Sequence, residues 1–511
     1  MKNINDRVGQ MLMAGFDGLT APDYLLEWLQ EGRLGGVILF ARNVESPAQL
    51  AALTRQLHSA AKYPLLISID QEGGTVARLR DCFTESPGAM ALASITGNAE
   101  SVTEDVSRVL AEEMQALGIN WTYAPVVDIS YNAENPTVGT RSFGSDQERV
   151  AALAAAAIRG FQLGGVAACA KHFPGLGNTT VDTHLALPRL DTPIDHLLHV
   201  DLLPYRVATA NDLATIMTTH TIFSTLDPDH PATLSSHIIS QLIRAELGFD
   251  GVVTSDCMEM KAIDDHYGVE ESSVRAANAG VDIILFSHTP AKQAAAYESL
   301  LAAVKRGDVS EDTVNAANAR IERLKARFPV GQVDAEQVYS EQHRALVGAA
   351  ARAGVTLLRE EPGVLPLHPD DDRRVMLVEL ASRRDSLVQD ENGYSPLARL
   401  IQAYLPDVHY VRLSASPDQA EIAAVLGTDV DVLVLATRSA HLIPAQADIV
   451  RKLAEHGAER VLVALRNPYD AGLIDGGTVI CTAGDSSPSL QAAADMLVGH
   501  FEPSGRLPVE S

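Results

Sequence analysis

The sequence has few cysteines and no long apolar run, and both shortages exclude classes of protein. Its four cysteines (Cys82, Cys169, Cys257 and Cys481) are scattered without a Cys-x-x-Cys spacing, so neither a disulfide framework nor a zinc site is predicted. No apolar stretch reaches the roughly 18 residues that a transmembrane helix needs, and we expect no membrane association. Gln10 interrupts the apolar run near the amino terminus and no cleavage-like site follows. We therefore expect no signal peptide and a cytoplasmic location.

Basic residues are also scarce, with 40 Lys and Arg against 66 Asp and Glu, a formal charge of −26. A surface that acidic repels polyphosphates, so nucleic acid is not an expected partner. The content of 46% hydrophobic and 21% charged residues is ordinary for a globular enzyme. Because 511 residues are too many for one core, two domains are expected.

Short apolar runs rich in β-branched residues alternate with longer helical stretches over the first 330 residues. Runs that are apolar on both faces are typical of parallel strands covered by helices. Eight of them predict a (β/α)₈ barrel of the TIM type, with an open doubly wound sheet as the alternative. The runs cover residues 11–16, 35–40, 64–70, 119–128, 167–173, 214–223, 251–257 and 281–286.

The pattern changes after residue 331 and predicts a second, smaller α/β layered domain. Residues 336–353 are expected to form a connecting helix, and a strand follows it. New strand-like runs then occur at 373–380, 407–413, 430–438, 459–468 and 477–484, most of them separated by helical segments. We therefore divide the chain into a barrel (1–335), a linker (336–353) and a carboxyl-terminal domain (354–511).

Ionisable residues stand directly at the ends of five predicted strands. In a barrel, the carboxyl ends of all strands converge on the face where catalysis usually occurs. Loop polarity alone is the competing explanation. The strand-end residues are Asp70 and Glu72, Asp128, Lys171 and His172, His220, and Asp256.

The segment KHFPGLGNTTVDTHLALP, residues 171–188, follows the fifth predicted strand and is unusually polar. Asp182 and His184 are two positions apart, so in an extended loop both side chains point the same way. The carboxylate can then orient the imidazole and make it more basic, which suits a group that passes protons at neutral pH. A local hydrogen bond that only staples the loop is the alternative.

This segment resembles the signature of glycoside hydrolase family 3, in its bacterial β-N-acetylglucosaminidase branch. Other stretches match in the same order along nearly the whole chain. They include GGVILFARN (35–43), SIDQEGGTVARL (68–79), SPGAMALA (86–93), NWTYAPVVDI (120–129), GTRSFG (139–144), DLLPYR (201–206), LGFDGVVTSDCMEM (247–260), GVTLLRE (354–360), RNPYD (466–470) and PSGRLPV (503–509).

The resemblance implies a retaining glycosidase with Asp256 as nucleophile and His184, polarised by Asp182, as acid/base. A carboxylate attacks the anomeric carbon while a second group protonates the leaving oxygen. Judged locally, Asp256 could instead cap a helix, and His172 could be a core histidine beside Phe173. By the same match, the residues that grip the terminal sugar are Asp70, Arg141, Lys171 and His172.

Two residues depart from the family loop: Leu176 stands where His is usual, and Asn178 where many members have Asp. These changes put the leaving-group site in question but leave the proposed nucleophile and the Asp182–His184 pair intact. Glu72 could contact the ligand or brace the turn at Gly73, and it is left out of the predicted site.

The expected function is therefore hydrolysis of terminal β-linked N-acetylglucosamine from peptidoglycan-turnover fragments. The same residues would also serve phosphorolysis, because a His acid/base does not repel phosphate as a carboxylate would. A catalytically inactive sugar-binding protein is the third alternative. No metal and no cofactor are expected, the partner is a small carbohydrate, and a homodimer is possible.

Overall fold

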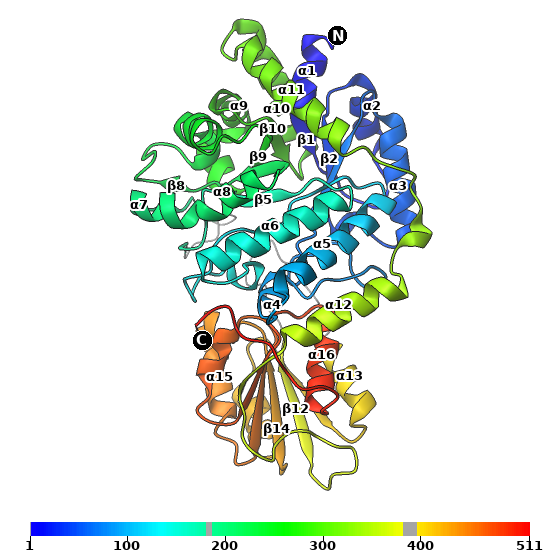
Figure 1. Cartoon of the computed structure of the whole chain (residues 1–511), viewed down its shortest axis with the longest axis vertical. Coiled ribbons are helices and arrows are strands. Elements are labelled where there is room, and N and C mark those ends of the chain that lie inside the picture. Colours follow the sequence, from blue (N-terminus) through cyan, green and yellow to red (C-terminus); the bar gives the residue numbers. More distant parts are fainter. Residues whose placement is uncertain (1, 180–186, 382–395, 511) are drawn as a thin grey trace.

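The computed structural model describes residues 2–179, 187–381 and 396–510 and shows a barrel above a separate carboxyl-terminal sheet domain (Figure 1). Eight parallel strands form the barrel sheet in the order β4-β3-β2-β1-β10-β9-β7-β5. All eight predicted runs contain one of these strands. They are β1 (Leu12–Ala14), β2 (Gly36–Leu39), β3 (Leu66–Ile69), β4 (Trp121–Thr122), β5 (Cys169–Phe173), β7 (Thr215–Thr218), β9 (Val252–Cys257) and β10 (Ile283–Phe286).

Bridges between β4 and β5 bring the two ends of this sheet together. Trp121 pairs with Ala167 and Val126 with Lys171, both in parallel. The amide of Val127 donates to the carbonyl of Lys171 at 2.9 Å. The sheet is thus a nearly closed barrel, as predicted, and not an open doubly wound sheet. A short parallel pair lies outside it, β6 (Arg189–Leu190) with β8 (Ile222–Phe223).

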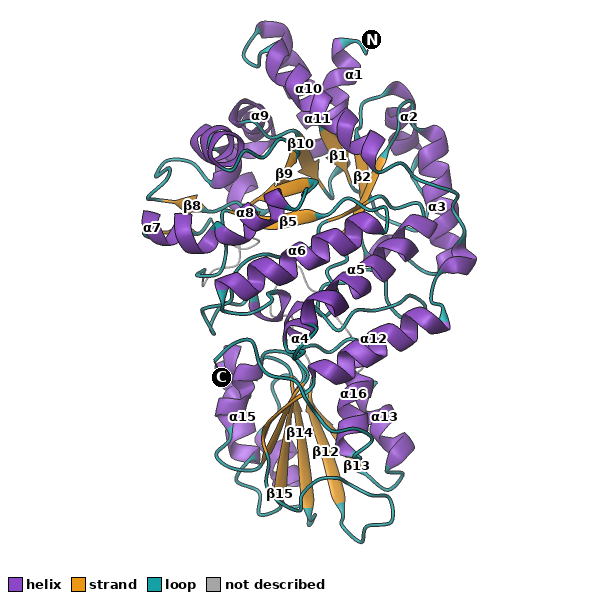
Figure 2. Ribbon diagram, in the orientation of Figure 1, coloured by secondary structure: helices purple, strands orange, loops and turns teal. Residues whose placement is uncertain are grey.

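Helices surround the barrel on its outside (Figure 2). Their ends follow sequence signals: Ser46 caps α3 by accepting from the amide of Gln49, and Gly307 ends α10 with a positive φ of 84°. The helices of this part are α1 (Ile4–Gln10), α2 (Asp23–Glu31), α3 (Pro47–Ala60), α4 (Ala89–Ala93), α5 (Ala99–Ala116), α6 (Gln147–Leu163), α7 (Ile194–His196), α8 (Leu203–Ala210), a π-helical segment (His237–Glu246), α9 (Lys261–Ala279), α10 (Pro290–Arg306) and α11 (Glu311–Arg327).

The barrel interior is packed with large side chains. Trp121 and Tyr123 are fully buried, and their rings meet edge to face with centroids 4.9 Å apart. The indole of Trp121 donates to the Thr215 hydroxyl at 3.0 Å, so its polar atom is satisfied inside the core. The barrel is therefore a rigid support for the residues at its rim.

Helix α12 (Glu341–Gly354) links the barrel to the carboxyl-terminal domain, and strand β11 follows it. The sequence predicted a connecting helix here, followed by a strand. That domain holds a mixed sheet in the order β11-β16-β15-β14-β12-β13, parallel except for β11. Its strands are β11 (Thr356–Arg359), β12 (Val375–Leu380), β13 (His409–Leu413), β14 (Val432–Thr437), β15 (Glu459–Ala464) and β16 (Thr478–Cys481), and its helices are α13 (Leu397–Tyr404), α14 (Gln419–Leu426), α15 (Pro444–Leu453) and α16 (Ser487–Leu497).

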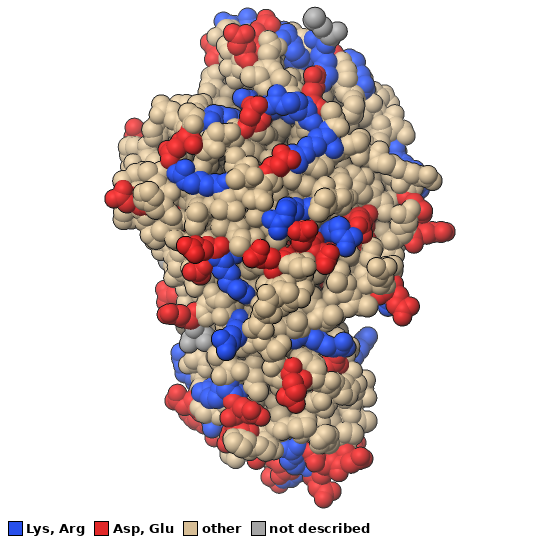
Figure 3. Space-filling model, in the orientation of Figure 1, with Lys and Arg blue, Asp and Glu red and all other residues tan. Residues whose placement is uncertain are grey.

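Charges of both signs are interspersed over the face of the molecule drawn in Figure 3. The four cysteines are free thiols. Within the described ranges, no helix combines the length and apolar character that crossing a membrane requires.

Candidate active site

Five charged side chains meet at the rim of the barrel, on β5 and on the loops that follow β3 and β4. They are Asp70, Glu72, Arg78, Arg141 and Lys171, here named the charged cluster. The ammonium of Lys171 donates to Asp70 Oδ1 at 2.8 Å and lies 2.6 Å from Glu72 Oε1. Its side chain is 2% exposed, whereas that of Asp70 is 13% exposed. Of the three side chains in these ion pairs, that of Asp70 is therefore the most exposed.

Arg141 joins the cluster through a bidentate ion pair with Glu72. Its Nε and Nη2 donate to the two carboxylate oxygens, each at 2.8 Å. Its Nη1 donates to the Thr137 carbonyl at 2.9 Å. This planar fork holds the guanidinium in one orientation. Arg78 completes the cluster, with Nη2 at 3.4 Å from Asp70 Oδ2.

The cluster keeps its carboxylates ionised despite burial. Burial alone would raise the pKa of Asp70, but the charges of Lys171 and Arg78 outweigh it and hold that pKa below its usual value. Burial opposes ionisation of Glu72 as well, yet Arg141 and Lys171 lower its pKa to about 2. Desolvation would lower the pKa of Lys171, and the same two carboxylates raise it instead. The cluster is a set of fixed charges, three cations against two carboxylates.

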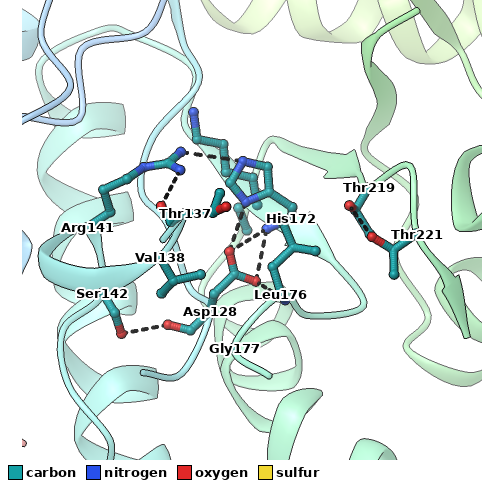
Figure 4. Close-up of polar contacts among 12 residues, drawn as sticks. Asp128, Thr137, Val138, Arg141, Ser142, His172, Leu176, Gly177, Thr219 and Thr221 are labelled. Carbon is teal, nitrogen blue, oxygen red and sulfur yellow. Dashed lines mark hydrogen bonds and ion pairs between the residues drawn. The ribbon is translucent and has the colours of Figure 1, made fainter. Parts of the chain in front are cut away.

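His172 lies between Arg141 and Asp128, as Figure 4 shows. Its Nδ1 donates to Asp128 Oδ2 at 2.8 Å, and its Nε2 is 3.5 Å from Nη2 of Arg141. The Asp128 carboxylate also accepts from the amides of His172 and of Leu176, the latter at 2.8 Å. His172 is therefore a buried histidine held in one orientation by a carboxylate, with Nε2 turned toward the charged cluster.

Asp256 stands at the end of β9, which is paired on both sides by β7 and β10. Its Oδ1 accepts from the amide of Cys257 at 2.7 Å. The following helix α9 begins at Lys261 with Met260 as its N-cap, so Asp256 is not the cap of that helix. Strand β9 is parallel to β7 and β10, and β7 is parallel to β5, so the carboxyl ends of these strands lie on one rim of the barrel. The strand-end Asp256 therefore lies on the same barrel rim as the charged cluster.

The other expected site residues fall in different places. Asp182 and His184 lie outside the described residues. His220 is buried and bonded through Nδ1 to Thr233 Oγ1 at 2.8 Å and through Nε2 to the Cys257 carbonyl at 2.9 Å. Of the two departures from the family loop, Leu176 is 1% exposed and Asn178 is exposed.

Sequence reasoning missed two residues of this site. Glu72 was left out, yet it binds both Arg141 and Lys171; its position two residues after Asp70, at the same strand end, was the available signal. Asp128 was noted at a strand end but given no role, and it holds His172. Their partners are distant in sequence, 69 residues for Glu72 with Arg141 and 44 for Asp128 with His172.

Chemically, the arrangement offers fixed charged donors and acceptors to a ligand with many hydroxyl groups. Charged groups fixed by buried partners form stronger hydrogen bonds than neutral ones and need no reorganisation when the ligand arrives. In the part of the chain that the structure describes, no three His, Cys, Asp or Glu side chains are grouped to hold a metal ion.

Comparisons with known proteins identify the family and the fold of this chain. Residues 3–324 match the Glycosyl hydrolase family 3 N terminal domain. The chain is 30% identical to Beta-hexosaminidase A of Pseudoalteromonas piscicida, covering 96% of this chain and 91% of that protein. It is 36% identical to Beta-hexosaminidase of Pseudomonas aeruginosa, over 68% of this chain and 98% of that one. A glycoside hydrolase family 3 beta-N-acetylglucosaminidase from Paenibacillus sp. str. FPU-7 superposes with a TM-score of 0.94 at 36% identity, covering 100% and 99% of the two chains.

Proposed function

The chain is a glycoside hydrolase that belongs to family 3, and we propose that it is an exo-acting, retaining β-N-acetylglucosaminidase. The observation that carries this proposal is the charged cluster at the barrel rim, on the same rim as the strand-end carboxylate of Asp256. Relatives named for hexosaminidase and N-acetylglucosaminidase activity support this sugar over glucose.

In the first step, an oxygen of Asp256 attacks the anomeric carbon of the terminal sugar. The glycosidic carbon–oxygen bond breaks, and the leaving oxygen takes a proton from His184. In the second step, water gives a proton to His184 and attacks the same carbon, and the bond to Asp256 breaks. Asp182 orients the His184 ring and stabilises its protonated form. Two inversions at one carbon retain the β configuration.

Asp70, Arg141, Lys171 and His172 grip the sugar in this proposal. Asp70 accepts from hydroxyl groups, while Lys171 and Arg141 donate to hydroxyl oxygens. Asp256 sits on a strand paired from both sides, which suits a nucleophile that must keep its position. The natural substrates are terminal N-acetylglucosaminides of peptidoglycan-turnover fragments.

The test compares an aryl β-N-acetylglucosaminide with the matching aryl β-glucoside. We expect turnover of the acetamido substrate and a loss of at least about 10³-fold in kcat for Asp256→Asn. Asp265→Asn is the matched control, because Asp265 is an exposed carboxylate nearby in sequence on α9. His184→Ala should lose less activity on an aryl leaving group than on a sugar leaving group, because a good leaving group needs no proton.

Product analysis separates the rival activities. A sugar 1-phosphate formed in phosphate buffer would establish phosphorolysis in place of hydrolysis. Retained sugar binding without turnover of either substrate would mean an inactive homologue. Mass spectrometry of a trapped glycosyl-enzyme should place the sugar on the peptide that contains Asp256, and a label on another residue would contradict the assigned nucleophile.

A further inference from the structure

Arg141 is carried by a loop that the carboxyl-terminal domain touches at three points. This loop, residues 131–145, follows β4 and is here named the Arg141 loop. Figure 1 shows the carboxyl-terminal domain directly below the barrel, with α4 and α12 at the junction. The contacts come from the segment after β14, from the motif RNPYD (466–470) and from the motif PSGRLPV (503–509). Both motifs lie outside the charged cluster, and both meet the loop that carries GTRSFG (139–144).

The first contact is His441, which bridges the two domains. Its Nδ1 lies 2.8 Å from Oδ1 of Asp470, and its Nε2 lies 3.1 Å from the carbonyl oxygen of Ala133. Asp470 is fully buried and also accepts from the amides of Ala440 and His441, at 3.0 and 2.9 Å. The ring of His441 is thus held from its own domain and presents Nε2 to the loop of the other.

The second contact is Asn467 against Gly139, two residues before Arg141. A Cβ on Gly139 would lie 2.9 Å from Oδ1 of Asn467, and the φ of Gly139 is +43°. Asn467 is itself fixed, since its Nδ2 donates to the Ser439 hydroxyl at 3.0 Å. Glycine at position 139 therefore permits an approach that no other residue would allow.

The third contact is made by the chain end. The carbonyl of Pro508 accepts from the amide of Ser145 at 3.0 Å, and a Cβ on Gly144 would lie 2.6 Å from that carbonyl oxygen. On its barrel side, the loop is bonded by Asn135, whose Nδ2 donates to the carbonyls of Leu176 and Gly177 at 2.8 and 3.1 Å. Arg141 lies between points of support on both sides.

The first two of these supports come from the carboxyl ends of strands in the second domain. His441 follows β14, and Asn467 and Asp470 follow β15. Open α/β sheets usually bind ligands at that edge. Ser487, after β16, also donates to Glu85 on the loop after β3 at 2.7 Å. Barrel loops thus occupy much of the edge where a ligand would otherwise bind.

We infer that the carboxyl-terminal domain positions the sugar-gripping guanidinium of Arg141, with His441 and Asn467 as the positioning residues. The inference rests on the proposed function in giving Arg141 a role toward the sugar. Neither positioning residue contacts the substrate; both act on the backbone of the Arg141 loop. Small displacements of a binding group by about 1 Å cost up to about 10²-fold in rate, so loss of one support reduces activity without removing any reacting group.

The experiment measures kcat and KM on the aryl β-N-acetylglucosaminide together with amide hydrogen exchange of residues 133–145. His441→Ala should raise KM and lower kcat/KM about 10-fold to 100-fold, with faster exchange in the loop. His441→Gln keeps a donor and should recover part of both. His456→Ala is the matched control: this histidine is also half-buried and bonded to a backbone carbonyl, that of Thr428 at 3.0 Å, but within its own domain.

Gly139→Ala provides a second variant with a suppressor. It should lower kcat/KM, and Gly139→Ala/Asn467→Ala should restore part of the loss by removing the clash. Unchanged KM and unchanged exchange in His441→Ala would overturn the inference. If the wild type turns over no aryl glycoside, the proposed function fails, whereas the exchange rates still decide whether His441 supports the loop.

Discussion

Replacing Lys171 by Met removes the ammonium group that lies between the carboxylates of Asp70 and Glu72, at 2.8 and 2.6 Å. The methionine side chain is of similar length and apolar, so the packing changes little. Glu72 keeps its bidentate partner Arg141 at 2.8 Å, but Asp70 is left with Arg78 at 3.4 Å. The free energy lost therefore arises mainly at Asp70.

The size of the loss follows from the burial of these groups. Breaking a buried ion pair by removing one partner costs about 3–5 kcal/mol, because the remaining charge is left without compensation. Asp70 keeps one distant cation and a 13% exposed side chain, so we expect the lower end, about 3 kcal/mol, in the free energy of unfolding. Adding Asp70→Asn removes the uncompensated charge. The loss in the free energy of unfolding of the double variant should therefore be smaller than the sum of the two single losses by about 1–3 kcal/mol.

Urea unfolding followed by tryptophan fluorescence is the assay, since both tryptophans, Trp28 in α2 and Trp121 in β4, lie in the barrel. The signal reports barrel unfolding and not that of the second domain. Lys305→Met, at an exposed lysine of α10, is the control and should change little. Two outcomes would refute the view that Lys171 and Asp70 stabilise each other. One is a double-variant loss in the free energy of unfolding that equals the sum of the two single losses within about 0.5 kcal/mol; the other is no loss in Lys171→Met.

Two further predictions concern pH. Burial lowers the pKa of Lys325 from 10.5 to about 7; the unfolded chain then binds more protons between these values, so the free energy of unfolding rises with pH across this window. Lys325→Met should abolish that rise, which is on the order of 4 kcal/mol, and urea unfolding at pH 7 and 10 would measure it. Glu72, whose pKa falls from 4.5 to about 2, stabilises the fold above pH 4.5 and loses this effect as the pH falls through 2. Acid unfolding of Glu72→Gln should therefore show a shallower loss of stability in that window, and an unchanged slope would contradict the role of its ion pairs.

Much of the fold could be predicted from the sequence because barrel strands carry a strong local signal. Runs apolar on both faces need cover on both sides, and all eight predicted runs hold a barrel strand. The strand-like runs predicted for the second domain also contain its strands β12 to β16. The ionisable residues at strand ends predicted that charged side chains meet at one rim of the barrel, since parallel strands place all their carboxyl ends there.

The pairings within the site could not be predicted in this way. Glu72 looked like a brace for the turn at Gly73, because its two partners, Arg141 and Lys171, are far along the chain. Asp128 had no visible role until His172 was placed beside it. The motif RNPYD matched the family without indicating a purpose, since the loop that it supports belongs to the other domain.

The sequence by itself determined which residues form strands and which ionisable groups stand at their ends, because burial pattern and chain direction are local properties. Only the tertiary structure decided which of these charges neutralise one another. An ion pair such as Lys171 with Asp70 spans 101 residues, and the contact of His441 with Ala133 spans 308. Such contacts depend on how the barrel closes and how the second domain docks, and no spacing along the chain encodes either distance.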